Sequence, residues 1–333
     1  MSYWFEPSNQ CHIAISSRIR LARNIKGIPF CTKMNTDHLK TINSLVRNAI
    51  SKSEHPIAKT LKYIEMDNIP QIERMAMVER HIISKNFALN YQGRAIIISD
   101  DESVCIMLGE EDHIRIQVLL SGLQLEKANE TANVIDDILC NSIDIAFDNR
   151  LGFLTECPTN LGTGLRASVM LHLPLLEAHG EIQKYVDTIS RMGFTARGMY
   201  GEGTKALASL YQLSNQITLG ISEKSAIDNI KILANQLIEK ETSYRKQLDM
   251  LKFEDRCMRS YGVLKNARIL TSEELMSRIS DIMIGESLGI IKISKCPMSV
   301  FVSGQPYMLM KKCGEMSADS RDIERANLVR SIL

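Results

Sequence analysis

The sequence carries almost no net charge and no long apolar segment. Lys and Arg number 40 against 39 Asp and Glu, so the formal net charge is +1. No global field would therefore hold the chain on nucleic acid or on an anionic membrane. No apolar run is long enough to span a bilayer, and the first residues lack a basic segment followed by an apolar one. We predict a soluble, cytoplasmic protein that binds neither nucleic acid nor membrane.

Cysteine pairs of the CxxC kind are also missing. The 8 cysteines are scattered, and none has histidines at metal-ligand spacing. This pattern argues against a zinc site and against a disulfide framework. We expect reduced thiols, at most one of which has a chemical role.

Two familiar nucleotide signatures are absent as well. The segment GMYGEGTK, residues 198–205, has the glycine spacing of a P-loop but ends in Gly-Thr-Lys, which is the wrong order for that phosphate cradle. The HRD and DFG signatures of protein kinases do not occur. Neither nucleotide-binding fold is predicted.

The chain has ample apolar material, since 44% of its 333 residues are hydrophobic, and this length favours two domains. Period-two patterns rich in β-branched residues predict strands, and patterns with a period of three to four predict helices. The predicted strands are RAIIISDD, SVCIML and HIRIQVLL within residues 94–120, then LGFLT (151–155), RASVMLHL (166–173) and QITLG (216–220). Helices are expected over 124–145 and 181–192. These elements predict an α+β fold with a mainly antiparallel sheet flanked by helices.

A helical stripe begins near Glu223 and continues through most of the remaining sequence. We therefore expect a catalytic domain over residues 1–235, followed by an all-helical domain over 236–333.

Arginines stand beside carboxylates in several short segments. In SSRIRLARN, residues 16–24, strand alternation puts Arg18 and Arg20 on one face, with Ile19 and Leu21 on the other. Two guanidinium forks side by side suit a polyphosphate. A solvated edge strand remains the alternative.

Three further segments allow a functional or a plain structural interpretation. GEEDHIRIQ, residues 109–117, has three consecutive acids that could form a solvated turn. CPTNLGTGLRASVMLHLP, residues 157–174, fits a structural turn or an anion-binding concavity. RGMYGEGTK, residues 197–205, predicts a loop bearing Arg197 and Glu202.

These segments occur together in the order and rough spacing seen in phosphagen kinases. The sequence most closely resembles the bacterial protein arginine kinases of this phosphagen-kinase-like (ATP:guanido phosphotransferase) superfamily, over residues 12 to 220, with a compatible tail. The resemblance implies a phosphagen-kinase-like catalytic domain that transfers phosphate from ATP, with Mg²⁺, to arginine side chains of proteins. Creatine and arginine kinases have a helical domain ahead of SSRIR, whereas here the segment starts at Ser16. We therefore expect an acceptor site open enough for a polypeptide.

The resemblance also implies site residues. Glu111 and Glu202 would bind the acceptor, with one or both as general base, and Cys157 would be the reactive cysteine of the family. Glu110 would lie near magnesium, through water. Gly109 stands where the family has Asn. The ATP-binding residues would be Ser16, Ser17, Arg18, Ile19, Arg20, His81, Arg115, Arg166, Ala167, Ser168, Val169, Met170, Arg197, Gly198, Met199, Tyr200, Gly201 and Glu202. From sequence alone, His81 could equally be a surface or helix-end histidine.

The segment SADSRDIERANLVRSIL predicts a C-terminal helix capped by Ser320 or Asp319, with Arg321, Asp322 and Arg325 exposed. A charged helical surface is the simple interpretation. By resemblance, RDIERA would be an allosteric phosphoarginine site in which Arg321 binds the phosphate and Asp322 the guanidinium. Its residues are Arg321, Asp322, Ile323, Glu324, Arg325 and Ala326.

The resemblance further implies a homodimer and partners in protein quality control. Expected partners are arginine-containing protein substrates, including a stress-gene repressor, an AAA+ chaperone-protease and a possible activator protein. Two alternatives stay open: a phosphagen kinase that acts on a free guanidino compound, and a phosphoarginine-binding adaptor without catalysis.

Overall fold

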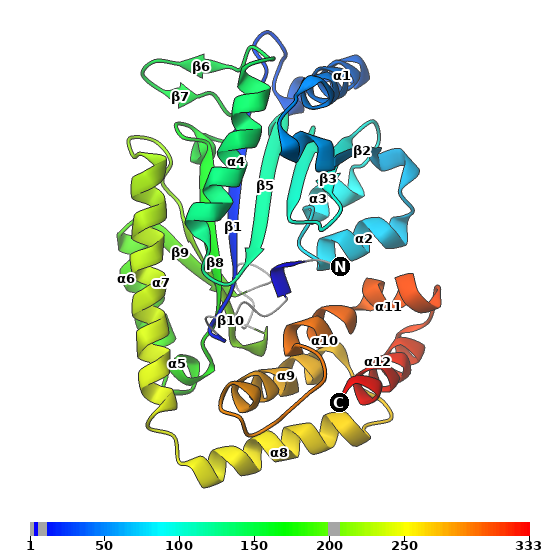
Figure 1. Cartoon of the computed structure of the whole chain (residues 1–333), viewed down its shortest axis with the longest axis vertical. Helices are drawn as coiled ribbons and strands as arrows, with labels where there is room; N and C mark the ends of the chain where they lie inside the picture. Colours follow the sequence, from blue (N-terminus) through cyan, green and yellow to red (C-terminus); the bar gives the residue numbers. More distant parts are fainter. Residues whose placement is uncertain (1–2, 6–11, 199–206) are drawn as a thin grey trace. The chain divides into compact units, whose positions relative to one another are not determined.

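The computed structural model describes residues 3–5, 12–198 and 207–333 (Figure 1). The described residues fall into two compact units, within Met1–Trp4, Ser16–Val169 and Ser214–Ile232, and within Phe5–Ile15, Met170–Leu213 and Leu233–Leu333.

The strands are β1 (Ala14–Arg23), β2 (Leu61–Glu65), β3 (Ala95–Ser99), β4 (Val104–Leu108), β5 (Ile114–Ser121), β8 (Leu165–His172), β9 (Phe194–Gly198) and β10 (Leu210–Asn215). They hydrogen-bond in the order β2-β3-β4-β5-β1-β8-β10-β9, and β6 (Phe147–Asp148) forms a separate hairpin with β7 (Gly152–Phe153). The pairs β2–β3, β3–β4, β4–β5 and β1–β5 are antiparallel. The predicted strands between residues 94 and 120 are confirmed.

In the first unit, helices pack on both faces of the strands. The residues of β3 and β4 are therefore buried at every position. On one face, α4 (Leu125–Cys140) packs along β5, and α1 (Thr36–Lys52) contacts α4 and β4 (Figure 1). On the other face, Ile96 and Met107 join an apolar cluster with Phe87. That cluster includes residues of α2 (Gln71–Glu79) and α3 (Lys85–Leu89).

The second unit is mainly helical. Its helices are α5 (Pro174–Ala178), α6 (Ile182–Arg191), the later part of α7 (Glu223–Arg245), α8 (Met250–Asn266), α9 (Ser272–Ser287), α10 (Pro297–Ser303), α11 (Pro306–Cys313) and α12 (Ala318–Ile332). Helix α9 packs against α8 and α10, and α12 against α8 and α11. Apolar side chains such as Phe301, Ile279 and Val329 are almost completely buried. The predicted α+β class with C-terminal helices is confirmed.

Short 3-10 helices complete the chain at Tyr3–Phe5, Cys31–Lys33, Pro56–Thr60, Met66–Asn68, Pro158–Asn160 and Leu207–Ser209. Among the described helices, none is both long and apolar enough to cross a membrane.

The prediction of a strand over QITLG, residues 216–220, is wrong. The strand β10 ends at Asn215, immediately before it. The Thr218 hydroxyl lies 2.9 Å from the carbonyl of Thr159 and 2.7 Å from that of Leu161. The segment is therefore held as a loop by bonds to another loop, which its apolar alternation did not indicate. In LGFLT, only Gly152 and Phe153 are extended, as β7.

Candidate active site

Arginines from three strands meet in the first unit. On β1, Arg18 and Arg20 alternate with Ile19 and Leu21, which are both fully buried. The predicted alternation is therefore present. Strand β5 supplies Arg115 and β8 supplies Arg166. The charges of Arg115 and Arg166 are close enough to lower the pKa of Arg18 and that of Arg20.

The cluster of Arg18, Arg20, Arg115 and Arg166 is electrostatically unfavourable as it stands. Burial, and after it the charges of Arg115 and Arg166, lower the pKa of Arg18 to about 9. Burial lowers the pKa of Arg20 well below its ordinary value, and the three neighbouring arginines add to this, while Glu110 opposes it. The buried Nε of Arg20 has no hydrogen-bond partner in the described part of the chain. Such a cluster would be neutralised by an anion that carries several charges.

Carboxylates follow directly in the loop between β4 and β5. Glu110 is buried, forms an ion pair with Arg115 at 2.7 Å, and accepts a hydrogen bond from the Ser84 hydroxyl at 2.6 Å. Burial opposes ionisation of Glu110, but Arg115 and the bonds from Ser84 and the Glu111 amide lower its pKa to about 2. The neighbouring Glu111 is exposed. Glu110 is thus a fixed anion, and Glu111 is accessible.

Gly109 opens this loop with φ of +80°, a conformation that favours glycine. A Cβ atom added there would lie 2.5 Å from a methyl group of Leu39, on α1. The glycine therefore allows α1 to pack closely on the loop, at the one position of the segment where the family motif has Asn.

Asp112 ties three segments together. It is 2% exposed and accepts hydrogen bonds from the Asn24 side chain at 2.7 Å, the Glu156 amide at 2.9 Å and the Asn160 side chain at 3.3 Å. The loop around Cys157 is thereby joined to the end of β1 and to the acidic loop. Sequence reasoning missed this role, although three successive acids gave a signal that one of them could be internal.

Cations and carboxylates line one cavity of about 60 Å³ in the first unit. Its lining residues are Arg20, Leu21, Ala22, Glu110, Glu111, Asp112, Arg115, Asn160, Gly164 and Arg166. The cavity has room for a few water molecules or a small polar group, but not for a whole nucleotide. The arginines that line the cavity suit a phosphate, and the acids that line it suit a guanidinium.

Cys157 lies at the start of the 3-10 helix Pro158–Asn160, whose last residue, Asn160, lines this cavity. Its side chain is half-buried, and Sγ lies 3.0 Å from the Thr159 hydroxyl oxygen. The Thr155 hydroxyl donates to the Cys157 carbonyl at 2.8 Å, which fixes the backbone here.

Comparison with known proteins decides the family. The profile described as "ATP:guanido phosphotransferase, C-terminal catalytic domain" matches residues 41–244, and "Protein-arginine kinase McsB C-terminal domain" matches residues 250–333. A protein-arginine kinase of Caldanaerobacter subterraneus is 41% identical over 96% of this chain and 97% of its own length. A protein-arginine kinase of Halothermothrix orenii is 42% identical over 100% of this chain and 97% of its own length. The chain belongs to the protein-arginine kinase branch of the ATP:guanido phosphotransferase family.

Two solved kinase structures share the fold. The duplicated taurocyamine kinase of Schistosoma mansoni, with bound transition state analog components, is 27% identical with a TM-score of 0.61 over 69% of this chain and 33% of that one. A lombricine kinase, at 22% identity, has a TM-score of 0.62 over 75% and 71% of the two chains. The phosphagen-kinase-like fold predicted for this family member is therefore confirmed.

His81 lies beside the arginine cluster of this family member. Burial and then Arg18 lower its pKa to about 3, so the ring is neutral at physiological pH, and its Nε2 atom has no hydrogen-bond partner among the described residues. The Trp4 ring meets the His81 ring edge-on at 5.3 Å between centroids, and the Trp4 indole donates to the Arg80 carbonyl at 2.8 Å. The imidazole is held in place with one nitrogen available.

The remaining predicted ATP-binding residues differ in accessibility. Ile19, Ala167 and Val169 are completely buried, so their side chains belong to the core. Ser16, Ser17 and Ser168 are also buried, and the Arg18 Nε donates to the Ser168 hydroxyl at 3.4 Å. In the second unit are Met170, Arg197 and Gly198, and the Arg197 Nε donates to the Thr195 hydroxyl at 3.1 Å. Met199, Tyr200, Gly201 and Glu202 lie outside the described residues.

The C-terminal helix corrects two predictions. Its cap is Ser317, whose hydroxyl accepts from the Ser320 amide at 3.2 Å, rather than Ser320 or Asp319. Arg325 is 1% exposed, not exposed as predicted, because its guanidinium donates to the carbonyls of Gly304 at 2.7 Å and Leu270 at 2.8 Å. It also pairs with Asp322.

The other residues of RDIERA have mixed surroundings. Ala326 is buried, whereas Ile323 is 44% exposed. Arg321 and Glu324 are half-buried, and the Arg321 guanidinium lies 3.6 Å from the Met310 sulfur. Arg325 and Ala326 therefore support the helix, while Arg321 and Ile323 remain accessible.

Proposed function

We propose that this protein transfers the γ-phosphate of ATP to the guanidinium of arginine residues in other proteins. One observation carries the proposal: guanidinium groups from three strands and the acids of one loop line the same cavity. Support also comes from relatives named protein-arginine kinase, which are 41–42% identical over nearly the whole chain.

The arginines have a direct electrostatic task in this reaction. Phosphoryl transfer depends mainly on positioning and on neutralising the charge of the transferring group. Burial beside like charges lowers the pKa of Arg18 and Arg20. An anionic phosphate chain would remove that destabilisation, so the cluster binds the nucleotide more strongly than separate arginines would.

The acceptor needs carboxylates, because a guanidinium is protonated at neutral pH and must lose a proton as the new bond forms. Glu111 is exposed and lines the cavity, so it orients the acceptor and takes the proton, together with Glu202. A bond forms between the acceptor nitrogen and Pγ, while the bond from Pγ to the bridging oxygen breaks and ADP leaves. Cys157, in the loop that carries Asn160 to the cavity, stabilises the acceptor electrostatically.

The residues present fit magnesium bound through phosphate and water. Among the described residues, no cluster of three or more His, Cys, Asp or Glu side chains is arranged to hold a metal ion. The carboxylate of Glu110 is already occupied by Ser84, Arg115 and the Glu111 amide. Magnesium would supply charge neutralisation on the phosphates, and Glu110 would hold its water shell.

Regulation and partners follow from family resemblance. We propose that Arg321 and Asp322 bind phosphoarginine as an allosteric ligand and that the chain acts in the cytoplasm as a homodimer. Its substrates would include a stress-gene repressor, and its products would be taken up by an AAA+ chaperone-protease, with a possible activator protein. The division into residues 1–235 and 236–333 stays a prediction.

The decisive test is mass spectrometry of acid-labile phosphate on arginine after incubation with Mg-ATP. An arginine-rich protein and free arginine are offered in parallel to the wild type and to Glu111→Gln. We expect phosphoarginine on the protein with wild type only. Phosphorylation of free arginine alone would favour a phosphagen kinase. Binding of phosphoarginine without any transfer would favour the adaptor.

A further inference from the structure

Arg23 occupies an unusual position on β1. Strand alternation puts it on the same face as Ile19 and Leu21, and its exposure is only 1%. A charged group on an apolar face is stable only when it is paired and its donors are satisfied. The partners of Arg23 therefore show what this position is used for.

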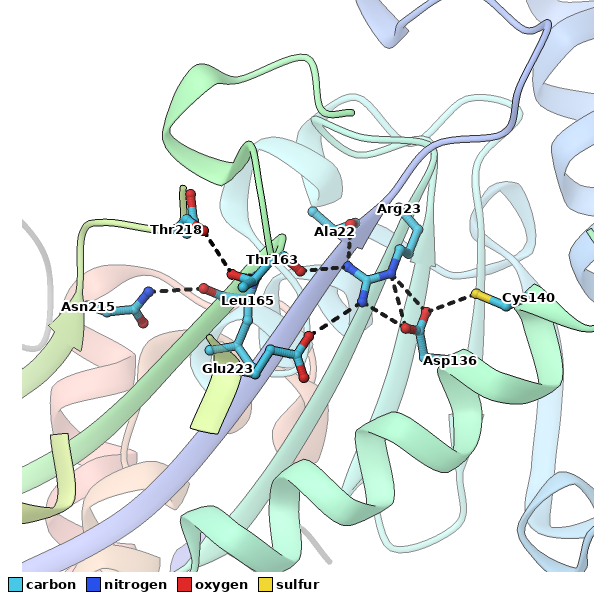
Figure 2. Close-up of polar contacts among 9 residues, drawn as sticks. All are labelled: Ala22, Arg23, Asp136, Cys140, Thr163, Leu165, Asn215, Thr218 and Glu223. Atoms are coloured by element: carbon cyan, nitrogen blue, oxygen red, sulfur yellow. Dashed lines mark hydrogen bonds and ion pairs between the residues drawn. The ribbon is translucent and has the colours of Figure 1, made fainter. Parts of the chain in front are cut away.

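One side of the guanidinium is neutralised by helix α4. The Arg23 Nε donates to both carboxylate oxygens of Asp136, at 2.9 and 3.1 Å, and Nη2 lies 2.7 Å from Oδ2 (Figure 2). Glu223 at the start of α7 lies 3.9 Å away, and the Phe153 ring lies 3.4 Å from the guanidinium carbon. The guanidinium is thus fixed from several directions.

The other side of the Arg23 guanidinium donates hydrogen bonds to a loop that lines the cavity. The Arg23 Nη1 donates to the carbonyl of Thr163 at 3.0 Å and to that of Ala22 at 2.9 Å (Figure 2). Thr163 precedes Gly164, which lines the cavity together with Asn160. The Ala22 amide donates to the Gly164 carbonyl at 2.9 Å, so two adjacent carbonyls at the end of the loop are bonded to β1.

Gly164 shows how close this approach is. Its φ is +62°, and a Cβ atom there would lie 2.6 Å from the Ala22 carbonyl oxygen and 2.7 Å from the Arg23 Nη1. No side chain fits between the guanidinium and the loop. The end of the loop at Gly164 is therefore held directly against Arg23.

We infer that Arg23 is a positioning residue for the phosphoryl transfer proposed above, and this inference rests on that proposal. Arg23 fixes the loop Cys157–Gly164, which carries Asn160 to the cavity. The arginines of the nucleotide side lie within strands and not in this loop: Arg18 and Arg20 on β1, Arg115 on its paired strand β5, and Arg166 on β8. Loss of Arg23 should therefore displace the acceptor side of the site while phosphate binding persists.

The test is Arg23→Lys in the full chain, assayed with Mg-ATP and an arginine-rich protein. Lysine keeps the charge but cannot reach Asp136 and both carbonyls at once. We expect kcat to fall about 100-fold, since a small misplacement costs that much, while the KM for ATP changes less than about threefold. The melting temperature is measured in parallel.

The matched control is Arg74→Lys. Arg74 is also a buried arginine of the first unit, and its guanidinium donates to the carbonyls of Ile69 and Ala88. We expect it to lower the melting temperature with little change in kcat. If Arg23→Lys loses activity only in proportion to its folded fraction, as the control does, the inference is wrong.

A second variant covers the case in which Arg23→Lys does not fold. Asp136→Asn keeps an oxygen acceptor for Arg23 but removes its counter-charge, so we expect a fall in kcat of about 10-fold with the KM for ATP unchanged. An unchanged kcat in this variant overturns the inference. Absence of arginine phosphorylation by the wild type would instead refute the proposed function.

Discussion

Arg20 and Arg23 are three positions apart on one strand, yet their surroundings are opposite. Arg23 is paired with Asp136 and donates to two carbonyls. Arg20 lies among Arg18, Arg115 and Arg166, and its Nε has no hydrogen-bond partner among the described residues. The charge of Arg23 is therefore fully paired, whereas that of Arg20 is opposed only by Glu110 among like charges.

The difference separates structural arginines from functional ones. A buried cation with a complete set of partners contributes to a unique fold, whereas one kept near like charges reduces stability until a ligand arrives. Arg325 belongs with Arg23, because it bonds to two carbonyls and to Asp322. The proximity of like charges, rather than the residue type, marks the candidate site.

The largest effect is expected from Arg20→Ala. Removing one phosphate-binding arginine should lower kcat/KM about 1,000-fold, because such cations stabilise the charge of the transferring group. Stability should stay constant or rise, since a buried like charge is removed. Enzyme kinetics and calorimetry check both parts. If the melting temperature of Arg20→Ala fell as far as that of an Arg23 variant, the distinction between a functional Arg20 and a structural Arg23 would be wrong.

Asp136→Ala tests the other member of the comparison. It leaves the Arg23 charge buried without its main partner, so the free energy of unfolding should fall by about 4 kcal/mol. Urea unfolding followed by circular dichroism measures this. Glu126→Ala, an exposed ion-pair variant on the same helix, serves as the control, with an expected change of at most about 1 kcal/mol. Equal losses of unfolding free energy in Asp136→Ala and Glu126→Ala would contradict the role of Asp136 as the main partner of the buried Arg23.

Glu110 should give the chain an acid-sensitive component of stability. Its pKa in the folded state, about 2, lies below the ordinary value of 4.5, so its contribution is complete above pH 4.5 and lost as the pH falls toward 2. That shift corresponds to about 3 kcal/mol. Unfolding free energies compared between wild type and Glu110→Gln across this pH range measure it. Parallel curves would show that the ion pair with Arg115 contributes nothing.

The smallest effect is a ligand-induced one. Inorganic triphosphate at 100 times its dissociation constant should stabilise the wild type by about 2.7 kcal/mol, because it binds the folded state only. Arg20→Ala should lose most of this gain, while Arg74→Lys should keep it. Thermal scans with and without triphosphate provide the comparison. Stabilisation that survives in Arg20→Ala would place the anion elsewhere.

Local patterns were enough to predict the strands and the alternation of Arg18 and Arg20, because side-chain period is a local property. The partners of Arg23 could not be predicted, since Asp136 and Thr163 lie 113 and 140 positions away in sequence. A charge on the same face as Ile19 and Leu21 did give a signal that a buried pair must exist. Roles of Glu111, Cys157 and His81 came from resemblance to the family.

Two of the wrong predictions have a common cause. QITLG has the apolar alternation of a strand but is held by side-chain bonds to another loop, and Arg325 has the charge of a surface residue but meets backbone carbonyls. In both cases a tertiary hydrogen bond overrides a local preference.

Trp4 is the only tryptophan of the chain, and its ring contacts that of His81. All of the tryptophan emission therefore arises beside the arginine cluster. The protein carries an intrinsic optical probe at this place, which needs no label and no substitution. Occupancy of the neighbouring site can thus be followed in the unmodified chain, in real time.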